Sequence, residues 1–175
     1  MFADKEVKAI ICLRGGSGAA RLLPLLDYKL IRNNPKVLLG YSDITALHNA
    51  IHAQTGLVSF HGPNGTGSWN SFNADQFQRL FFNRELMQYQ NVLDAKDELV
   101  ARQNRTITIT GGKVQGELVG GNLSILYSLL GSPSAIDCRD KILFIEDLDE
   151  YLYHIDRMMM NLKRNGCLES LKGII

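Results

Sequence analysis

The sequence has few of the features that mark specialised classes of protein. It contains three cysteines in 175 residues (Cys12, Cys138 and Cys167), and no two of them have CxxC spacing. This odd, scattered set predicts neither a disulfide framework nor a zinc site, and it is typical of a reducing compartment. Cys12 lies in the apolar run "KAIICL", so we expect a buried hydrophobic residue there rather than a nucleophile.

Long apolar runs and blocks of like charge are also missing. No stretch approaches the roughly 18 apolar residues that span a bilayer. The start, "MFADKEVKAI", lacks the basic and apolar regions of a secretory signal. The net charge is +1, and lysine and arginine are spread along the chain. We therefore expect a cytoplasmic protein with no membrane partner and no nucleic-acid partner.

What is present is the composition of a soluble globular protein, with 45% hydrophobic and 21% charged residues. Apolar runs predict buried strands at residues 8–13, 35–41 and 57–63. A glycine turn with a short helix (14–27) and a longer helix (43–56) separate them. Strands that alternate with helices in this way indicate a parallel sheet in an α/β domain.

The rest of the chain also mixes helices and strands, with no internal repeat. The patterns predict a polar loop at 64–74, a helix at 75–87 and a hairpin at 106–121. They further predict a helix at 122–131, a buried strand at 141–147 and an amphipathic helix at 150–166. We expect an incomplete, Rossmann-like N-terminal domain (1–102) and part of a smaller α/β C-terminal domain (103–175). The chain opens just before a strand and stops on "LKGII", itself strand-like, so both ends are expected to be cut.

One turn stands out, in the segment "LLGYSDITA" at residues 38–46. Ligands of open α/β sheets lie at the carboxyl ends of the strands, and Ser42 follows such an end. A nucleophile elbow needs a small residue before the serine, and Gly40 meets that need. The usual G-x-S-x-G has a glycine where this chain has Ile44, so the alternative that Ser42 or Asp43 is simply a helix N-cap remains open.

A nucleophilic serine also needs donors for the oxyanion. The peptide N–H of Asp43 at the helix N-terminus is one candidate, and the backbone of Gly15 or Gly16 is the second. The same loop, "RGGSGAAR", has a competing interpretation as a phosphate cradle. Arg21 occupies the place of the third glycine of a dinucleotide fingerprint, which makes that match poor.

Four histidines are candidates for a base, a ligand or a substrate contact. His48 and His52 are four residues apart and could chelate zinc, but the glutamate of H-E-x-x-H and a third ligand are absent, so no metal or other cofactor is predicted. A partly exposed helix face is the alternative. His61 could line a pocket or bond its own turn, and with Arg14 it is a candidate for binding substrate. His154, within an amphipathic helix, is predicted to be structural.

Four carboxylates follow the strand "KILFI", namely Glu146, Asp147, Asp149 and Glu150. A solvated loop or a magnesium site would both fit this composition. Glu146 ends a buried strand, where a carboxylate is unfavourable without a partner, so it is the best candidate to orient a histidine.

Five segments together resemble one family closely. They are the ordered blocks "VKAIICLRGGSGAARLLPLLD", "NPKVLLGYSDITALH", "GLVSFHGP", "GELVGGNLSILYSLLGSP" and "ILFIEDLDEYLYHIDRMMMNL". They resemble the LD-carboxypeptidases, the serine peptidases that include the murein tetrapeptide carboxypeptidase and the microcin C self-immunity peptidase. The resemblance covers nearly the whole chain.

The resemblance implies a cytoplasmic, homodimeric, metal-independent serine peptidase of cell-wall recycling. It makes Ser42 the nucleophile, Glu146 the orienting acid, and Asp43 with the "RGG" glycines the oxyanion hole. The implied reaction hydrolyses the amide between an L-centre, such as meso-diaminopimelate or lysine, and the terminal D-alanine of a murein tetrapeptide, through an acyl-enzyme.

The family's catalytic histidine lies downstream of the glutamate block, and none of the four histidines of this chain matches it. The 175 residues alone are therefore expected to be inactive. Two alternatives remain open. One is a microcin C-like hydrolase of peptidyl-nucleotides, whose discriminating feature is an aromatic loop; Trp69 is the only tryptophan here. The other is a non-catalytic remnant or binding module.

Overall fold

A computed structural model describes residues 1–90 and 106–175. The chain divides into two compact units, one of Met1–Ser68 with Val114–Ile175 and one of Trp69–Lys113, and each is described by itself. The predicted domain boundary between residues 102 and 103 lies outside the described residues.

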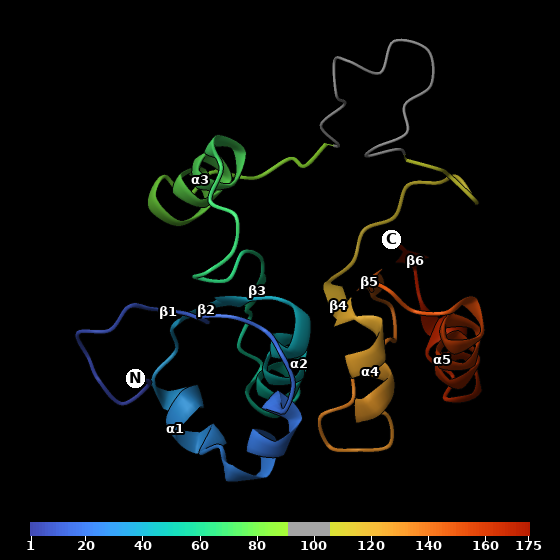
Figure 1. The fold of residues 1–175 in the computed structure, drawn as a ribbon, viewed down its shortest axis with the longest axis horizontal. Helices are drawn as coiled ribbons and strands as arrows, with labels where there is room; N and C mark the ends of the chain where they lie inside the picture. Colours follow the sequence, from blue (N-terminus) through green and yellow to red (C-terminus); the bar gives the residue numbers. More distant parts are fainter. Residues whose placement is uncertain (91–105) are drawn as a thin grey trace. The chain divides into compact units, whose positions relative to one another are not determined.

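The N-terminal half of the larger unit contains a three-stranded parallel sheet in the order β1-β2-β3 (Figure 1). The strands are β1 (Ala9–Ile11), β2 (Val37–Gly40) and β3 (Phe60–His61). Leu38 and Leu39 of β2 are each only 3% exposed, as expected for the central strand of a covered sheet. The three strands predicted from apolar runs are confirmed, and each is shorter than its run.

Helices α1 (Tyr28–Asn33) and α2 (Thr45–Thr55) lie together on one side of this sheet (Figure 1). A 3₁₀ helix, Ala19–Leu25, precedes α1, and Asp27 caps α1 by accepting a hydrogen bond from the Leu30 N–H at 2.8 Å. Gly56 ends α2 in the left-handed conformation with φ 74°, as the sequence predicted.

The C-terminal half of the larger unit contains a second parallel sheet, in the order β4-β5-β6. Its strands are β4 (Leu118–Asn122), β5 (Ile142–Glu146) and β6 (Gly173–Ile174), and helices α4 (Leu123–Leu129) and α5 (Leu152–Arg164) connect them, with a short 3₁₀ turn, Leu168–Ser170, before β6. The predicted α/β fold class, with a parallel sheet in the N-terminal part followed by a further α/β part, is confirmed. The parallel pairing in the second sheet is a finding of the structure.

The hairpin predicted at residues 106–121 is wrong. Residues 106–117 form no strand, Ile107 and Ile109 are exposed, and β4 bonds to β5 in parallel. An alternating pattern indicates a strand's two faces but not its partner, because the backbone groups that bond to it come from elsewhere in the chain.

The core consists of separate apolar clusters. One lies under the second sheet and includes Leu126, Leu143 and Leu162. Another joins Ile31 of α1, Leu38 of β2 and Ile51 of α2, which seats both helices on the first sheet. A third includes Ala46 and Ala50 of α2 with Leu129 of α4, so α2 contacts elements of both halves.

The cysteine prediction also needs correction. Cys138 and Cys167, 29 residues apart, form a disulfide in the core of the second sheet, with Cα atoms 5.1 Å apart. Sequence spacing missed this pair because the two residues meet through the packing of α5 beside the start of β5. Cys12 is free and half-buried, and burial raises the pKa of its thiol, which fits the predicted hydrophobic role.

The smaller unit contains α3 (Ser71–Phe77), which continues as a π-helical turn, Gln78–Phe82. Trp69 packs edge-to-face against Phe77 with ring centroids 5.3 Å apart. Within the described ranges, the helices all lack the length and apolarity that crossing a membrane requires.

Candidate active site

Ser42 occupies a sharp turn between β2 and α2. Its φ is +66°, in the left-handed region that residues with a side chain rarely adopt. Tyr41 before it is fully extended, and the 3₁₀ turn Ser42–Ile44 leads directly into α2. The sequence-predicted elbow is therefore present as geometry. A conformation of this kind persists only where the surrounding structure holds it in place.

Two glycines let the chain approach this turn closely. A Cβ on Gly40 would lie 3.0 Å from atoms of Cys12, Ile44 and Asn64, so β2 has no room for a side chain there. A Cβ on Gly15 would lie 2.8 Å from the Ser42 Cβ and 2.9 Å from its Oγ. The "RGG" loop therefore lies directly against the serine.

Asp43 holds that loop through its side chain. Its Oδ2 accepts a hydrogen bond from the Ala19 N–H at 2.8 Å, and the residue is only 6% exposed. Ala19 begins the 3₁₀ helix that follows Gly15 and Gly16, so the carboxylate ties the glycine loop to the elbow. Arg14 at the start of the loop is exposed. Ser42, Asp43 and Gly15 thus come together as one local group, and Gly16 is the next residue of the same loop.

Glu146 ends β5, where it pairs in register with Asn122 of β4. Burial raises the pKa of its carboxyl, as does the charge of Asp147, while a hydrogen bond from the Asn122 side chain opposes the shift. Its Oε1 is buried and has no hydrogen-bond partner among the described residues. A buried acceptor without a donor is unfavourable, so this oxygen is suited to receive an N–H donor.

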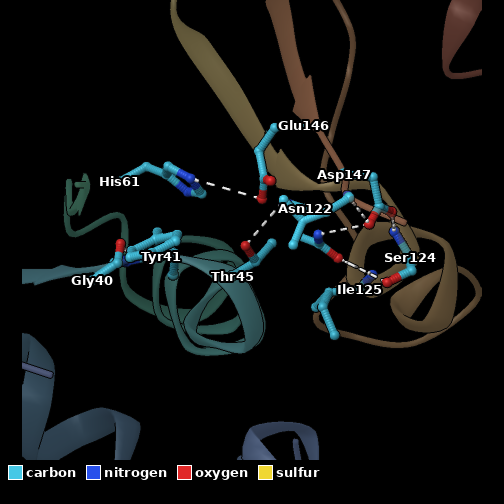
Figure 2. Close-up of polar contacts among 12 residues, drawn as sticks. Gly40, Tyr41, Thr45, His61, Asn122, Ser124, Ile125, Glu146 and Asp147 are labelled. Atoms are coloured by element: carbon cyan, nitrogen blue, oxygen red, sulfur yellow. Dashed lines mark hydrogen bonds and ion pairs between the residues drawn. The ribbon is translucent and has the colours of Figure 1, made fainter. Parts of the chain in front are cut away.

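His61, at the end of β3, points toward this oxygen (Figure 2). Its Nε2 lies 3.9 Å from the Glu146 Oε1, which is too long for a hydrogen bond. Its ring contacts Phe144 edge-on, with centroids 4.9 Å apart. Burial, with a further contribution from His48, lowers the pKa of His61 to about 4, so the ring is neutral near pH 7. His61 also pairs in register with Gly40, which connects it to the elbow strand.

The other three histidines have separate partners. His48 donates from Nε2 to the Gly40 carbonyl at 2.9 Å, and burial lowers its pKa. The His52 Nε2 lies 2.8 Å from the Glu117 Oε1. His154 bonds Glu150 through Nδ1 at 2.8 Å, one turn earlier in the chain. Among the described residues, no group of three or more ligating side chains is arranged to hold a metal ion.

The remaining carboxylates of the "IEDLDE" segment have different surroundings. Asp147 accepts hydrogen bonds from the Asn122 Nδ2 at 3.2 Å and from the Ser124 N–H at 2.9 Å, at the start of α4 (Figure 2). Asp149 is exposed with φ 60°, and Glu150 bonds His154. Only Glu146 combines partial burial with an unpaired oxygen.

Sequence reasoning missed two residues of this region, Thr45 and Asn122. Asn122 caps α4, since its Oδ1 accepts from the Ile125 N–H at 3.2 Å. The signal was available, because asparagine after "GG" and before an apolar helix is a common N-cap pattern. Thr45 had no sequence signal, because its Oγ1 accepts a hydrogen bond from the backbone N–H of Asn122, which is 77 residues away in the sequence.

A cavity of about 330 Å³ lies next to this region. Its lining includes His48, His52, His61 and Phe144, but neither Ser42 nor Glu146. His61 therefore borders the cavity, and its Nε2 lies 3.9 Å from the Glu146 Oε1.

Comparison with known families finds two matching profiles. The profile of the LD-carboxypeptidase N-terminal domain matches residues 1–62, and that of the LD-carboxypeptidase C-terminal domain matches residues 115–175. The chain belongs to the LD-carboxypeptidase family.

Individual relatives support the same assignment. The "Probable murein peptide carboxypeptidase" of Bacillus subtilis (strain 168) is 47% identical over all of this chain and 53% of its own length. The microcin C7 self-immunity protein MccF of Escherichia coli is 32% identical over 98% of this chain and 56% of its own. The crystal structure of an MccF-like protein from Bacillus anthracis str. Ames superposes with a TM-score of 0.80 at 34% identity, covering 99% of this chain and 58% of that one. The chain spans about half the length of the curated relatives it matches.

Proposed function

We propose that this chain carries the nucleophile and the acid of a serine LD-carboxypeptidase. The observation that carries the proposal is Ser42 at φ +66°, with Gly15 seated against its side chain. The Ser42 Oγ attacks the carbonyl carbon of the amide between an L-centre, meso-diaminopimelate or lysine, and a terminal D-alanine. A histidine takes its proton, and Glu146 orients that histidine.

The backbone N–H of Asp43 with that of Gly15 or Gly16 stabilises the tetrahedral oxyanion. The histidine then protonates the leaving nitrogen, so D-alanine departs and an ester remains on Ser42. Water adds to the ester with the same histidine as base, which releases the shortened peptide and restores the serine. Arg14 and His61 are proposed to contact the substrate. The site is proposed to need no metal, and the protein is proposed to be a cytoplasmic homodimer.

The base is proposed to be a histidine outside these 175 residues, at the family's position after the glutamate block. The unpaired Oε1 of Glu146 is where such a histidine would donate. The intact mass of the native polypeptide, compared with 19.5 kDa for these residues, tests whether further chain is present to supply it.

The central test is D-alanine release from a murein tetrapeptide by the complete native polypeptide. We expect turnover in the wild type, and a fall of about 10³-fold or more in Ser42→Ala, because the other members of a triad do little without the nucleophile. Released D-alanine is measured by chiral chromatography. A tetrapeptide ending in L-alanine should not be cleaved.

Ser128→Ala is the matched control. The Ser128 hydroxyl bonds the Ile125 carbonyl within α4, away from the elbow, so its loss should leave turnover unchanged. His61→Gln should raise KM with less than about a tenfold change in kcat, since its proposed role is binding. Full activity in Ser42→Ala, or a fall of 10³-fold in His61→Gln, would contradict these assignments.

A second candidate substrate is a peptidyl-nucleotide, because MccF is among the relatives. The aromatic residue considered for such a ligand, Trp69, packs on Phe77 within the smaller unit. We therefore expect kcat/KM to be higher for the tetrapeptide. A non-catalytic binding module would take up tetrapeptide without reacting with a fluorophosphonate probe at Ser42.

A further inference from the structure

Helix α2 and strand β4 are joined by hydrogen bonds between side chains and backbone. Thr45, in the first turn of α2, is fully buried, and its Oγ1 accepts a hydrogen bond from the Asn122 backbone N–H at 3.0 Å (Figure 2). One turn later, Asn49 donates from Nδ2 to the Gly120 carbonyl at 3.2 Å. Residues of α2 four apart therefore bond directly to the backbone of β4.

Glycine makes this approach possible. A Cβ on Gly121 would lie 2.6 Å from the Thr45 Cγ2 and 2.7 Å from its Oγ1. Gly121 also has φ +130°, a conformation open mainly to glycine. Because Gly121 has no side chain, α2 contacts the backbone of β4 directly, and the Thr45 hydroxyl lies within hydrogen-bond distance of the Asn122 N–H.

On the other side, Asn122 is tied to the strand that carries Glu146. Asn122 and Glu146 are register partners in β4 and β5, and the Asn122 Nδ2 donates to Asp147, the residue after Glu146. On the helix side, the Thr45 N–H bonds the carbonyls of Ser42 and Asp43. A continuous series of bonds thus runs from the elbow through Thr45 and Asn122 to the end of β5.

We propose that Thr45 is a positioning residue that sets the placement of Ser42 relative to Glu146 through its hydrogen bond to Asn122. The inference rests on the proposed function, because it concerns the geometry of the same reaction. Displacing a catalytic group by about 1 Å can lower a rate by about 10²-fold. The hydroxyl of Thr45 connects the first turn of α2, which follows Ser42, to β4 of the sheet that carries Glu146.

The test compares Thr45→Val with Thr45→Ser in the complete native polypeptide. Valine keeps the shape and the methyl contact with Gly121 but leaves the Asn122 N–H without its acceptor. We expect kcat for D-alanine release to fall about 10–100-fold in Thr45→Val with KM within about threefold. Thr45→Ser restores the hydroxyl and should keep kcat within about threefold of the wild type.

Thr55→Val is the matched control, at the other end of the same helix. The Thr55 hydroxyl donates to the Ile51 carbonyl and accepts from the Leu57 N–H, both at the C-terminal end of α2, so its loss should leave kcat unchanged. If Thr45→Val does not fold, as judged by circular dichroism and thermal unfolding, the pair Thr45→Ala and Thr45→Ser makes the same comparison without added bulk. A positioning role requires the hydroxyl-bearing variant of that pair to be the faster enzyme by about tenfold.

The rate of fluorophosphonate labelling at Ser42 provides a readout independent of the substrate. Labelling should slow in Thr45→Val in parallel with kcat and recover in Thr45→Ser. If the wild type is labelled but releases no D-alanine, the proposed substrate is refuted. The labelling rates of the Thr45 variants then still test the positioning role. Equal kcat and equal labelling in Thr45→Val and wild type would overturn the positioning role alone. A wild type that neither labels nor turns over would overturn both.

Discussion

At the scale of single residues, the turn at Ser42 combines an unfavourable backbone conformation with tight surroundings. A left-handed φ at a residue with a side chain is unfavourable by about 1–3 kcal/mol. Gly15 lies against the Ser42 side chain, and Asp43 anchors the loop beside it. Glycine would adopt this conformation at lower cost, so the serine side chain at position 42 is unfavourable for the stability of the turn.

Ser42→Gly is therefore expected to have opposite effects on stability and on activity. Glycine adopts φ +66° readily, so Ser42→Gly should be about 1 kcal/mol more stable than Ser42→Ala, while both lack D-alanine release. Urea unfolding of the two variants measures the difference.

Ala53→Gly, at an exposed position inside α2, is the comparison for a residue with ordinary helical φ. There, glycine should lower the free energy of unfolding by about 1 kcal/mol. A Ser42→Gly variant less stable than Ser42→Ala would show that the turn carries no strain from its side chain.

At the scale of elements, the second sheet depends on glycines that let β4 approach its neighbours. Gly120 has φ +139°, and a Cβ there would lie 1.8 Å from the carbonyl oxygen of Phe144 on β5. Gly121, the next residue, faces Thr45 on the other side. The pair "GG" therefore allows one strand to contact both β5 and α2.

Gly120→Ala is therefore expected to destabilise the protein by about 3 kcal/mol or more, because both the clash and the positive φ oppose the side chain. Gly131→Ala is the control, since Gly131 also has positive φ (78°) but open space around it. It should lose only about 1 kcal/mol. Thermal unfolding measures both, and equal losses would mean that the close approach of β4 to β5 contributes nothing.

At the scale of the whole molecule, the disulfide joins segments on either side of β5. Cys138 precedes that strand and Cys167 follows α5, and both are buried in the same apolar cluster. The pair closes a loop over a sequence separation of 29 residues. Cross-linking a loop of this size reduces the entropy of the unfolded chain.

Reduction of this disulfide is expected to lower the free energy of unfolding by about 3–4 kcal/mol. Chemical denaturation with and without a reductant measures the change, and mass shifts after thiol alkylation show the bond's state. The double variant Cys138→Ala with Cys167→Ala should match the reduced wild type and should not respond to reductant. An unchanged denaturation midpoint after complete reduction would contradict the stabilising role.

Much of the fold followed from sequence. Apolar runs predicted all three strands of the first sheet, and β5 and the strand-like character of "LKGII" in the second, because buried parallel strands have no polar face. Gly56 and Gly166 marked the ends of α2 and α5, since both have the left-handed φ that glycine permits. The alternating pattern at residues 106–121 predicted a hairpin that is not there, because the one strand in this range, β4, pairs with β5.

The sequence by itself determined the α/β alternation, the serine turn and the acidic strand end, since these depend on local periodicity and on glycine's backbone freedom. Only the tertiary structure decided the Cys138–Cys167 bond, the position of His61 beside Glu146, and the bond from Thr45 to Asn122. Each of these joins residues tens of positions apart, and such contacts form only when separate elements pack on a shared core.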